Sequence, residues 1–105
     1  MKELTVDELK SMMDNKEYFQ LIDVREEYEY DIVNIGGELI PLNTFIDNPD
    51  KVNREIKTVV HCKSGARSAV AIRQLESKFG FTNLYNLKGG IIAWAKLIDT
   101  SFPVY

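Results

Sequence analysis

The sequence predicts an α/β fold, a single small domain in which a central, mainly parallel sheet is flanked by helices. Short apolar runs that indicate strands alternate with segments of helical periodicity, which is the pattern of a parallel sheet covered by helices. The chain has 105 residues, of which 45% are hydrophobic and 28% charged, an ordinary composition for one globular domain. No internal repeat interrupts the alternation, so we expect residues 1–105 to form one domain.

The first helix is marked by the residues at its start. Thr5 precedes Glu8 by three positions, which is the spacing of a capping box, and the helix should therefore begin directly after Thr5. Val6, Leu9 and Met13 follow at the spacing of one helix face. We expect this face to pack against the sheet.

The other elements follow the same alternation. The middle of the chain predicts a buried strand over 19–24, a short acidic helix over 26–33, a short strand over 38–42 that Pro41 limits, and one irregular helix after Pro49. The last part predicts a strand over 58–62, a helix over 68–79 that ends at Gly80, a short strand over 83–87, a turn at Gly89-Gly90 and a helix over 91–98.

Composition excludes several classes of function. The net charge of −3 gives no reason to expect nucleic acid or an anionic membrane as a partner. No stretch of about 18 apolar residues occurs and the N-terminal residues lack the apolar core of a leader, so a cytoplasmic location is the expectation. One cysteine and one histidine cannot build a zinc site by themselves, and we expect neither a metal nor another cofactor.

The only cysteine, Cys62, lies where a predicted buried strand meets a predicted helix. In open α/β sheets this edge carries the ligand sites. The N-terminus of the following helix offers unpaired N–H groups and a positive dipole, and Lys63 and Arg67 add two full charges. Such surroundings lower a thiol pKa from about 8.5 to between roughly 3.5 and 7.5. We therefore interpret Cys62 as a reactive thiol rather than as an inert core residue.

The other loop residues suit an anion-binding role. Gly65 allows a sharp turn that lets successive N–H groups converge, and Ala66 keeps the rim of the loop free of bulk. Ser64 and Ser68 supply hydroxyl groups, and Ser68 is the candidate N-cap of the following helix. The whole loop therefore predicts a cradle for a thiolate or a small anion.

Four residues outside the loop have structural interpretations. His61 precedes Cys62 on a strand, so its ring should point to the opposite face of the sheet and cannot form a dyad with the sulfur. Asp23 and Arg25 end the earlier strand, where an ion pair supporting the sheet edge is favoured over catalysis. Trp94 on the last helix is expected in the core.

Three segments give the chain a resemblance to the rhodanese-like domain family over nearly its whole length. LIDVREEYEYDIVNIGGELIPL resembles the first signature of that family, VVHCKSGARSAVAIRQL its active-site strand, loop and helix, and NLYNLKGGIIAWAKLID its closing glycine turn and tryptophan helix. The resemblance implies a sulfurtransferase in which Cys62 becomes a persulfide, with donors such as thiosulfate or a persulfidated cysteine desulfurase. It implies that the loop binds donor and persulfide through Lys63, Ser64, Gly65, Ala66, Arg67 and Ser68.

The GGELIPL segment and the C-terminal sequence resemble more narrowly the rhodanese domains fused to ubiquitin-activating-enzyme-like adenylyltransferases. This likeness implies an acceptor protein or an adenylyltransferase as partner, and a role in molybdopterin or thiamine synthesis or in tRNA thiolation. The chain would then be a fragment of a fusion or a free-standing relative. One departure is Asn34, where the family often has histidine, and no role is assigned to that position.

Two alternatives stay open at this point. A cysteine phosphatase, of the kind found in cell-cycle phosphatases and arsenate reductases, has five residues between the cysteine and the arginine, whereas four separate Cys62 from Arg67 here. A non-catalytic binding or regulatory module is the other alternative, although such modules have lost the cysteine that this chain keeps. The shorter loop and the retained thiol both favour sulfur transfer.

Overall fold

The computed structural model describes residues 1–103 and 105, which form a five-stranded, wholly parallel sheet with helices on both faces. The predicted α/β class is therefore confirmed. The strand order is β1-β5-β4-β2-β3. The strands are β1 (Glu3–Leu4), β2 (Gln20–Asp23), β3 (Glu38–Leu39), β4 (Thr58–His61) and β5 (Leu84–Leu87).

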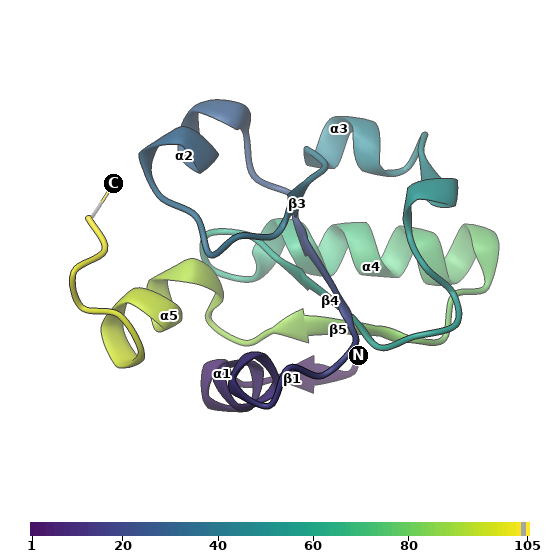
Figure 1. The fold of residues 1–105 in the computed structure, drawn as a ribbon. Coiled ribbons are helices and arrows are strands. Elements are labelled where there is room, and N and C mark those ends of the chain that lie inside the picture. Colours follow the sequence, from purple (N-terminus) through teal and green to yellow (C-terminus); the bar gives the residue numbers. More distant parts are fainter. Residues whose placement is uncertain (104) are drawn as a thin grey trace.

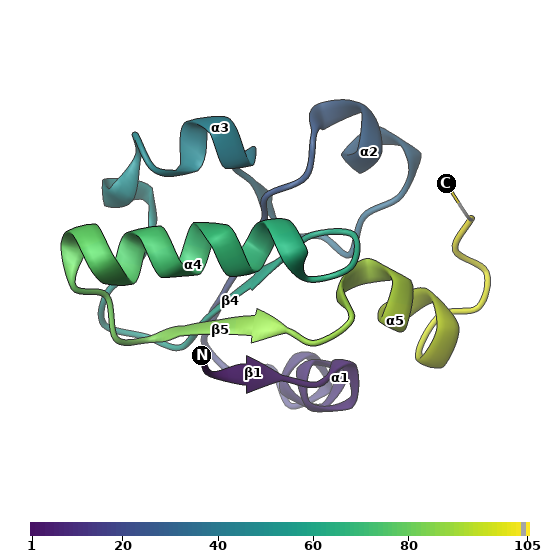
Figure 2. The same ribbon diagram turned by 180° about the vertical axis from the view of Figure 1, so that it is seen from behind.

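The helices form one layer on each side of the sheet. In Figure 1, α3 and α4 lie above the strands, α1 lies below them, and α5, which contacts α1, lies to their left. Figure 2 shows α4 running alongside β5. The helical segments are α1 (Val6–Asp14), α2 (Glu27–Ile32), α3 (Leu42–Phe45), a 3₁₀ turn (Pro49–Lys51), α4 (Ala66–Phe79) and α5 (Gly90–Leu97). None of the helices in the described part of the chain is both long and apolar enough to cross a bilayer.

The central strand β4 divides the core into two halves, because successive side chains of a strand point to opposite faces. Val60 packs with residues of α3 and α4, and Val59 packs with residues of α1 and α5. Cys62, two residues after Val60, belongs to the same half as Val60. The thiol therefore faces α4.

The predicted capping box at the start of α1 is confirmed. The Thr5 hydroxyl accepts a hydrogen bond from the N–H of Glu8, and the Glu8 carboxylate accepts one from the N–H of Thr5. The buried face differs by one residue from the prediction, since Met12 is buried and Met13 only partly so. The buried residues of α1 are therefore Val6, Leu9 and Met12, each three positions after the one before.

One other prediction about local structure needs correction, and two short elements were not predicted. The predicted irregular helix after Pro49 is only a 3₁₀ turn, and an α-helix that was not predicted, α3, forms before Pro49. The reason is tertiary: the short helix places Phe45 in the core, where it is fully buried. The sequence also gave no indication of β1, because two residues are too short for a periodic pattern.

Candidate active-site loop

The loop after β4 lies at the point in the sheet where the strand order reverses. From β2 the chain adds β3 on one side and then returns to place β4 on the other. Ligand sites of open parallel sheets lie at such switch points, at the carboxyl ends of the strands. Cys62 follows the last residue of β4, and Asp23 ends the neighbouring strand in register with His61.

Gly65, rather than Ser68, is the N-cap of α4, which corrects the predicted cap. Gly65 has a φ of 107°, a conformation that non-glycine residues rarely adopt, and the helix therefore starts at Ala66. Ser68 lies within the first turn of α4 and is fully buried. The earlier start turns the Ser68 side chain toward the thiol instead of toward the helix end.

The Cys62 sulfur lies among hydrogen-bond donors of the loop. The N–H groups of Gly65 and Ser68 donate to Sγ at 3.1 and 3.4 Å, and the Ser68 hydroxyl lies 3.4 Å from it. The residue is only 1% exposed. The predicted convergence of N–H groups on one point is therefore present, and its centre is the sulfur atom.

The pKa of the Cys62 thiol is lowered, although burial by itself would raise it. The groups that overcome burial are the hydroxyl and N–H of Ser68 and the N–H groups of Gly65 and Ser64. Hydrogen bonds to a thiolate favour its charged form. The sequence predicted contributions from N–H groups, from the helix dipole and from the charges of Lys63 and Arg67, and in the structure the causes that lower the pKa are the hydrogen bonds of the loop.

Arg67 is paired with a carboxylate. Its two terminal nitrogens donate to the two carboxylate oxygens of Glu29 on α2, at 2.6 and 2.9 Å. These hydrogen bonds lower the pKa of Glu29 to about 2. Much of the positive charge predicted for the loop is therefore compensated. Glu29 is a partner that the sequence did not reveal, since it lies 38 residues from Arg67.

The predicted ion pair at the end of β2 is confirmed. The guanidinium of Arg25 contacts both carboxylate oxygens of Asp23, with Nη2 2.8 Å from Oδ2, and both side chains are fully buried. Burial opposes the charge of Arg25, but the hydrogen bonds that the guanidinium donates to Asp23 and to the Tyr105 hydroxyl outweigh this effect and raise the pKa of Arg25. This buried pair fixes the sheet edge beside the loop.

His61 is a buried, neutral residue. It faces Asp23, with Nε2 3.7 Å from Oδ2, and burial lowers its pKa. Because His61 and Cys62 are adjacent, their side chains lie on opposite faces, and the ring approaches only the carbonyl oxygen of Cys62, at 3.4 Å. The structure therefore offers no His-Cys dyad.

The glycine turn before α5 supports the loop from behind. The N–H groups of Ile91 and Ile92 donate to the carbonyl oxygens of Cys62 and Lys63 at 3.0 and 3.1 Å. A Cβ atom at Gly90 would lie 2.6 Å from the Cys62 oxygen and 2.4 Å from the Lys63 oxygen. The turn was predicted, but its contact with the loop was not.

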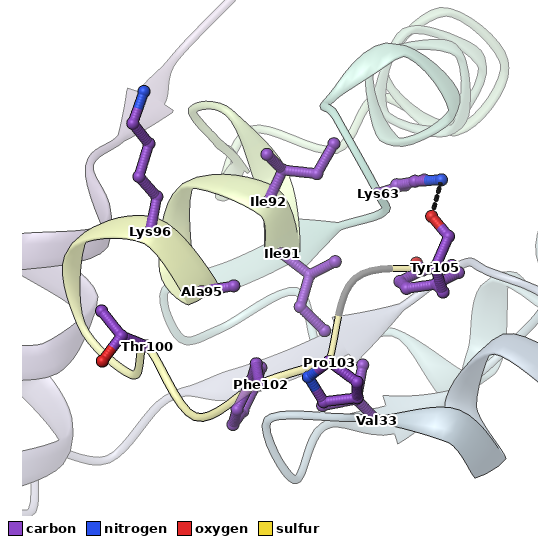
Figure 3. A pocket seen from close by; sticks show the side chains of 10 residues that line it. All are labelled: Val33, Lys63, Ile91, Ile92, Ala95, Lys96, Thr100, Phe102, Pro103 and Tyr105. Carbon is purple, nitrogen blue, oxygen red and sulfur yellow. Dashed lines mark hydrogen bonds between the residues drawn. The ribbon is translucent and has the colours of Figure 1, made fainter.

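A cavity of about 460 Å³ lies beside the loop. Figure 3 shows Lys63 and Tyr105 at one end of it and residues of α5 and the C-terminal segment around the rest. The Lys63 ammonium donates to the Tyr105 carbonyl oxygen at 2.5 Å and lies over its ring. Tyr105 also accepts a hydrogen bond from Arg25 through its hydroxyl, at 2.7 Å. Lys63 is thus directed to this tyrosine.

Asn34, which had no assigned role, ties down the end of α2. Its side chain accepts a hydrogen bond from the N–H of Gly36 and donates one to the carbonyl of Tyr30.

Within residues 1–103 and 105, no group of three or more His, Cys, Asp or Glu side chains is placed to hold a metal ion.

Comparison with known proteins identifies the family. The model of the Rhodanese-like domain family matches residues 5–97. The chain belongs to this family. The rhodanese-like domain protein of Staphylococcus aureus, whose crystal structure is known, is 34% identical, with a TM-score of 0.80 over 90% of this chain and 91% of that one. The predicted resemblance is therefore confirmed.

The narrower likeness to adenylyltransferase fusions is also confirmed. The probable adenylyltransferase/sulfurtransferase MoeZ of Mycobacterium tuberculosis is 38% identical over 97% of this chain, and the adenylyltransferase and sulfurtransferase MOCS3 of Xenopus laevis is 33% identical over 97%. The chain spans 26% and 27% of the length of these two relatives. It is related to their rhodanese domains.

Proposed function

We propose that this rhodanese-like domain is a sulfurtransferase that carries sulfur on Cys62 as a persulfide. The observation that carries the proposal is the sulfur itself, which accepts hydrogen bonds from the N–H groups of Gly65 and Ser68 at the carboxyl end of β4. Groups that stabilise a thiolate also stabilise a persulfide anion. The loop from Lys63 to Ser68 would bind the donor, and Asp23 and Arg25 would support its position.

The reaction consists of two displacements at sulfur. The Cys62 thiolate attacks the outer sulfur of thiosulfate, a new S–S bond forms, and sulfite leaves with the electron pair of the bond that breaks. A thiophilic acceptor such as cyanide then attacks the outer sulfur of the persulfide. The product thiocyanate leaves, and the Cys62 thiolate is regenerated without any net oxidation of the protein.

The physiological partners belong to the same proposal. A persulfidated cysteine desulfurase is a second donor with the same sulfane chemistry. The relatives named adenylyltransferase and sulfurtransferase suggest that an adenylyltransferase, or the protein it activates, is the acceptor, and that the sulfur enters molybdopterin or thiamine synthesis or tRNA thiolation. We place the reaction in the cytoplasm, where an unpaired thiol stays reduced.

Steady-state turnover of thiosulfate and cyanide tests the catalytic role of the thiol. We expect Cys62→Ser to lose sulfur transfer completely while it keeps the unfolding midpoint of the parent chain within a few degrees. Turnover that survives in Cys62→Ser would overturn the mechanism. Hydrolysis of an aryl phosphate faster than sulfur transfer would favour the phosphatase alternative, and a chain with neither activity would favour a docking module.

A further inference from the structure

The side chain of Asn86 on β5 holds two residues of the loop at once. Asn86 is 5% exposed, its Nδ2 donates to the Gly65 carbonyl oxygen at 3.1 Å, and its Oδ1 accepts from the Ser68 hydroxyl at 2.6 Å. A carbonyl oxygen can only accept, so Nδ2 must face Gly65. The amide oxygen therefore has to face Ser68.

The Ser68 hydroxyl has one proton and two neighbours that can accept it. These are Oδ1 of Asn86 at 2.6 Å and Sγ of Cys62 at 3.4 Å. When Cys62 is a thiol, its S–H can donate to Ser68 Oγ while Ser68 donates to Asn86, and every group is satisfied. When Cys62 is a thiolate, the sulfur and the amide oxygen compete for the same proton.

We propose that Asn86 is a positioning residue that holds the Ser68 hydroxyl proton away from Cys62 and gives it up when the thiol ionises. Because this proposal concerns the form in which Cys62 attacks a donor, it rests on the proposed sulfur transfer. The ionisation of Cys62 then depends on Asn86 of β5. Among the described residues, no hydrogen bond joins Asn86 to the sulfur.

The charged and titratable groups around the loop have other partners. Arg67 on α4 pairs with Glu29 on α2, Arg25 pairs with Asp23 beside His61, and Lys63 contacts Tyr105. Among the described residues, the hydrogen bonds that reach Sγ come from the loop and the first turn of α4. Asn86 and Cys62 therefore compete only for the proton of the Ser68 hydroxyl, and these charged groups take no part in that competition.

A double-mutant cycle on the pH dependence of Cys62 alkylation tests this proposal. We expect Asn86→Leu to lower the midpoint pH by about 0.5 to 1 unit, because the freed hydroxyl donates fully to the thiolate. Ser68→Ala should raise the midpoint, and Asn86→Leu should then have no further lowering effect in the Ser68→Ala background. An upward shift in Asn86→Leu, or an equal shift in both backgrounds, would overturn the proposal and indicate loosening of the loop through Gly65.

A measurement on the unsubstituted chain guards against misfolding of the variants. The ¹³C resonance of the Asn86 side-chain carbonyl should titrate with the midpoint found by alkylation, since the amide oxygen loses its hydrogen bond as the thiolate forms. A resonance that stays constant through the midpoint would contradict the proposal. Neither experiment uses sulfur transfer, so a chain that titrates as described yet never takes up sulfur would overturn the proposed function alone.

Discussion

The thiol cradle and its charged surroundings stabilise anions by different means. In the cradle, formed by the backbone of residues 62–68 and the Ser68 hydroxyl, two N–H groups donate to a buried sulfur and the hydroxyl lies beside it. In the surroundings, the guanidinium groups of Arg25 and Arg67 are each bound to a carboxylate. The comparison indicates that fixed dipoles set the state of the thiol, whereas the ion pairs hold the elements that position those dipoles.

The largest expected effect comes from breaking the contact behind the cradle. Gly90→Ala should lower the free energy of unfolding by more than about 2 kcal/mol, because the new Cβ meets the loop carbonyls and Gly90 has a positive φ. Denaturant unfolding measures this change. Gly80→Ala is a matched control, since Gly80 also has a positive φ but would place its Cβ in open space.

In that control we expect a loss of only about 1 kcal/mol, from backbone strain alone. The midpoint pH of Cys62 alkylation should rise in Gly90→Ala and stay constant in Gly80→Ala. Equal losses of stability in the two variants would show that the loop does not depend on the close approach of Gly90.

A smaller effect, on the pKa of the Cys62 thiol, distinguishes the contribution of the cradle from that of the surrounding charges. Ser68→Ala should raise the pKa of the Cys62 thiol more than Arg67→Ala does, because it removes a hydroxyl that can donate to the thiolate, whereas the charge of Arg67 is compensated by Glu29. The rate of alkylation against pH gives both values. A larger shift in Arg67→Ala would show that the charge of Arg67 has more effect on the thiol than the Ser68 hydroxyl does.

The smallest effect concerns acid stability. The pKa of Glu29 is about 2 in the folded chain, below its usual value in an unfolded chain. Because the pKa of Glu29 is lower in the folded chain, its pair with Arg67 stabilises the fold fully above about pH 4.5. This contribution is lost as the pH falls toward 2 and Glu29 becomes protonated. Arg67→Met should therefore be less stable at pH 7 and lose less stability between pH 5 and 2.

Chemical denaturation at several pH values measures that difference. Lys10→Met is the control, because it removes an exposed pair with Asp14 that should contribute little. If Arg67→Met and the parent chain lose stability in parallel below pH 5, the pair with Glu29 does not account for the acid sensitivity.

The sequence was informative where local pattern and chemistry coincide. The capping box at Thr5, the strand before Cys62 and the glycine at position 65 are local signals, and each predicted its feature correctly. The ion pair of Asp23 and Arg25 was also accessible, since the two residues are near neighbours in the chain. The fold class and the position of the loop follow from such signals.

The partners of the loop residues could not be predicted in this way. Glu29, Asn86 and Gly90 lie far from Cys62 in the chain, and only the packing of α2, β5 and the turn before α5 brings them to the loop. The one feature of the sequence that pointed to a role for Asn86 was its place as a polar residue within a buried strand. The start of α4 was misplaced for a related reason, since serine is a common N-cap and the left-handed Gly65 replaces it.

Intact mass spectrometry after incubation with thiosulfate is the most direct test of whether Cys62 carries sulfur. We expect the chain to gain the mass of one sulfur atom, peptide analysis to place that atom on Cys62, and cyanide to remove it. Cys62→Ser should gain nothing under the same conditions. A chain that keeps its unmodified mass with both thiosulfate and a persulfidated cysteine desulfurase would contradict the role of Cys62 as a sulfur carrier.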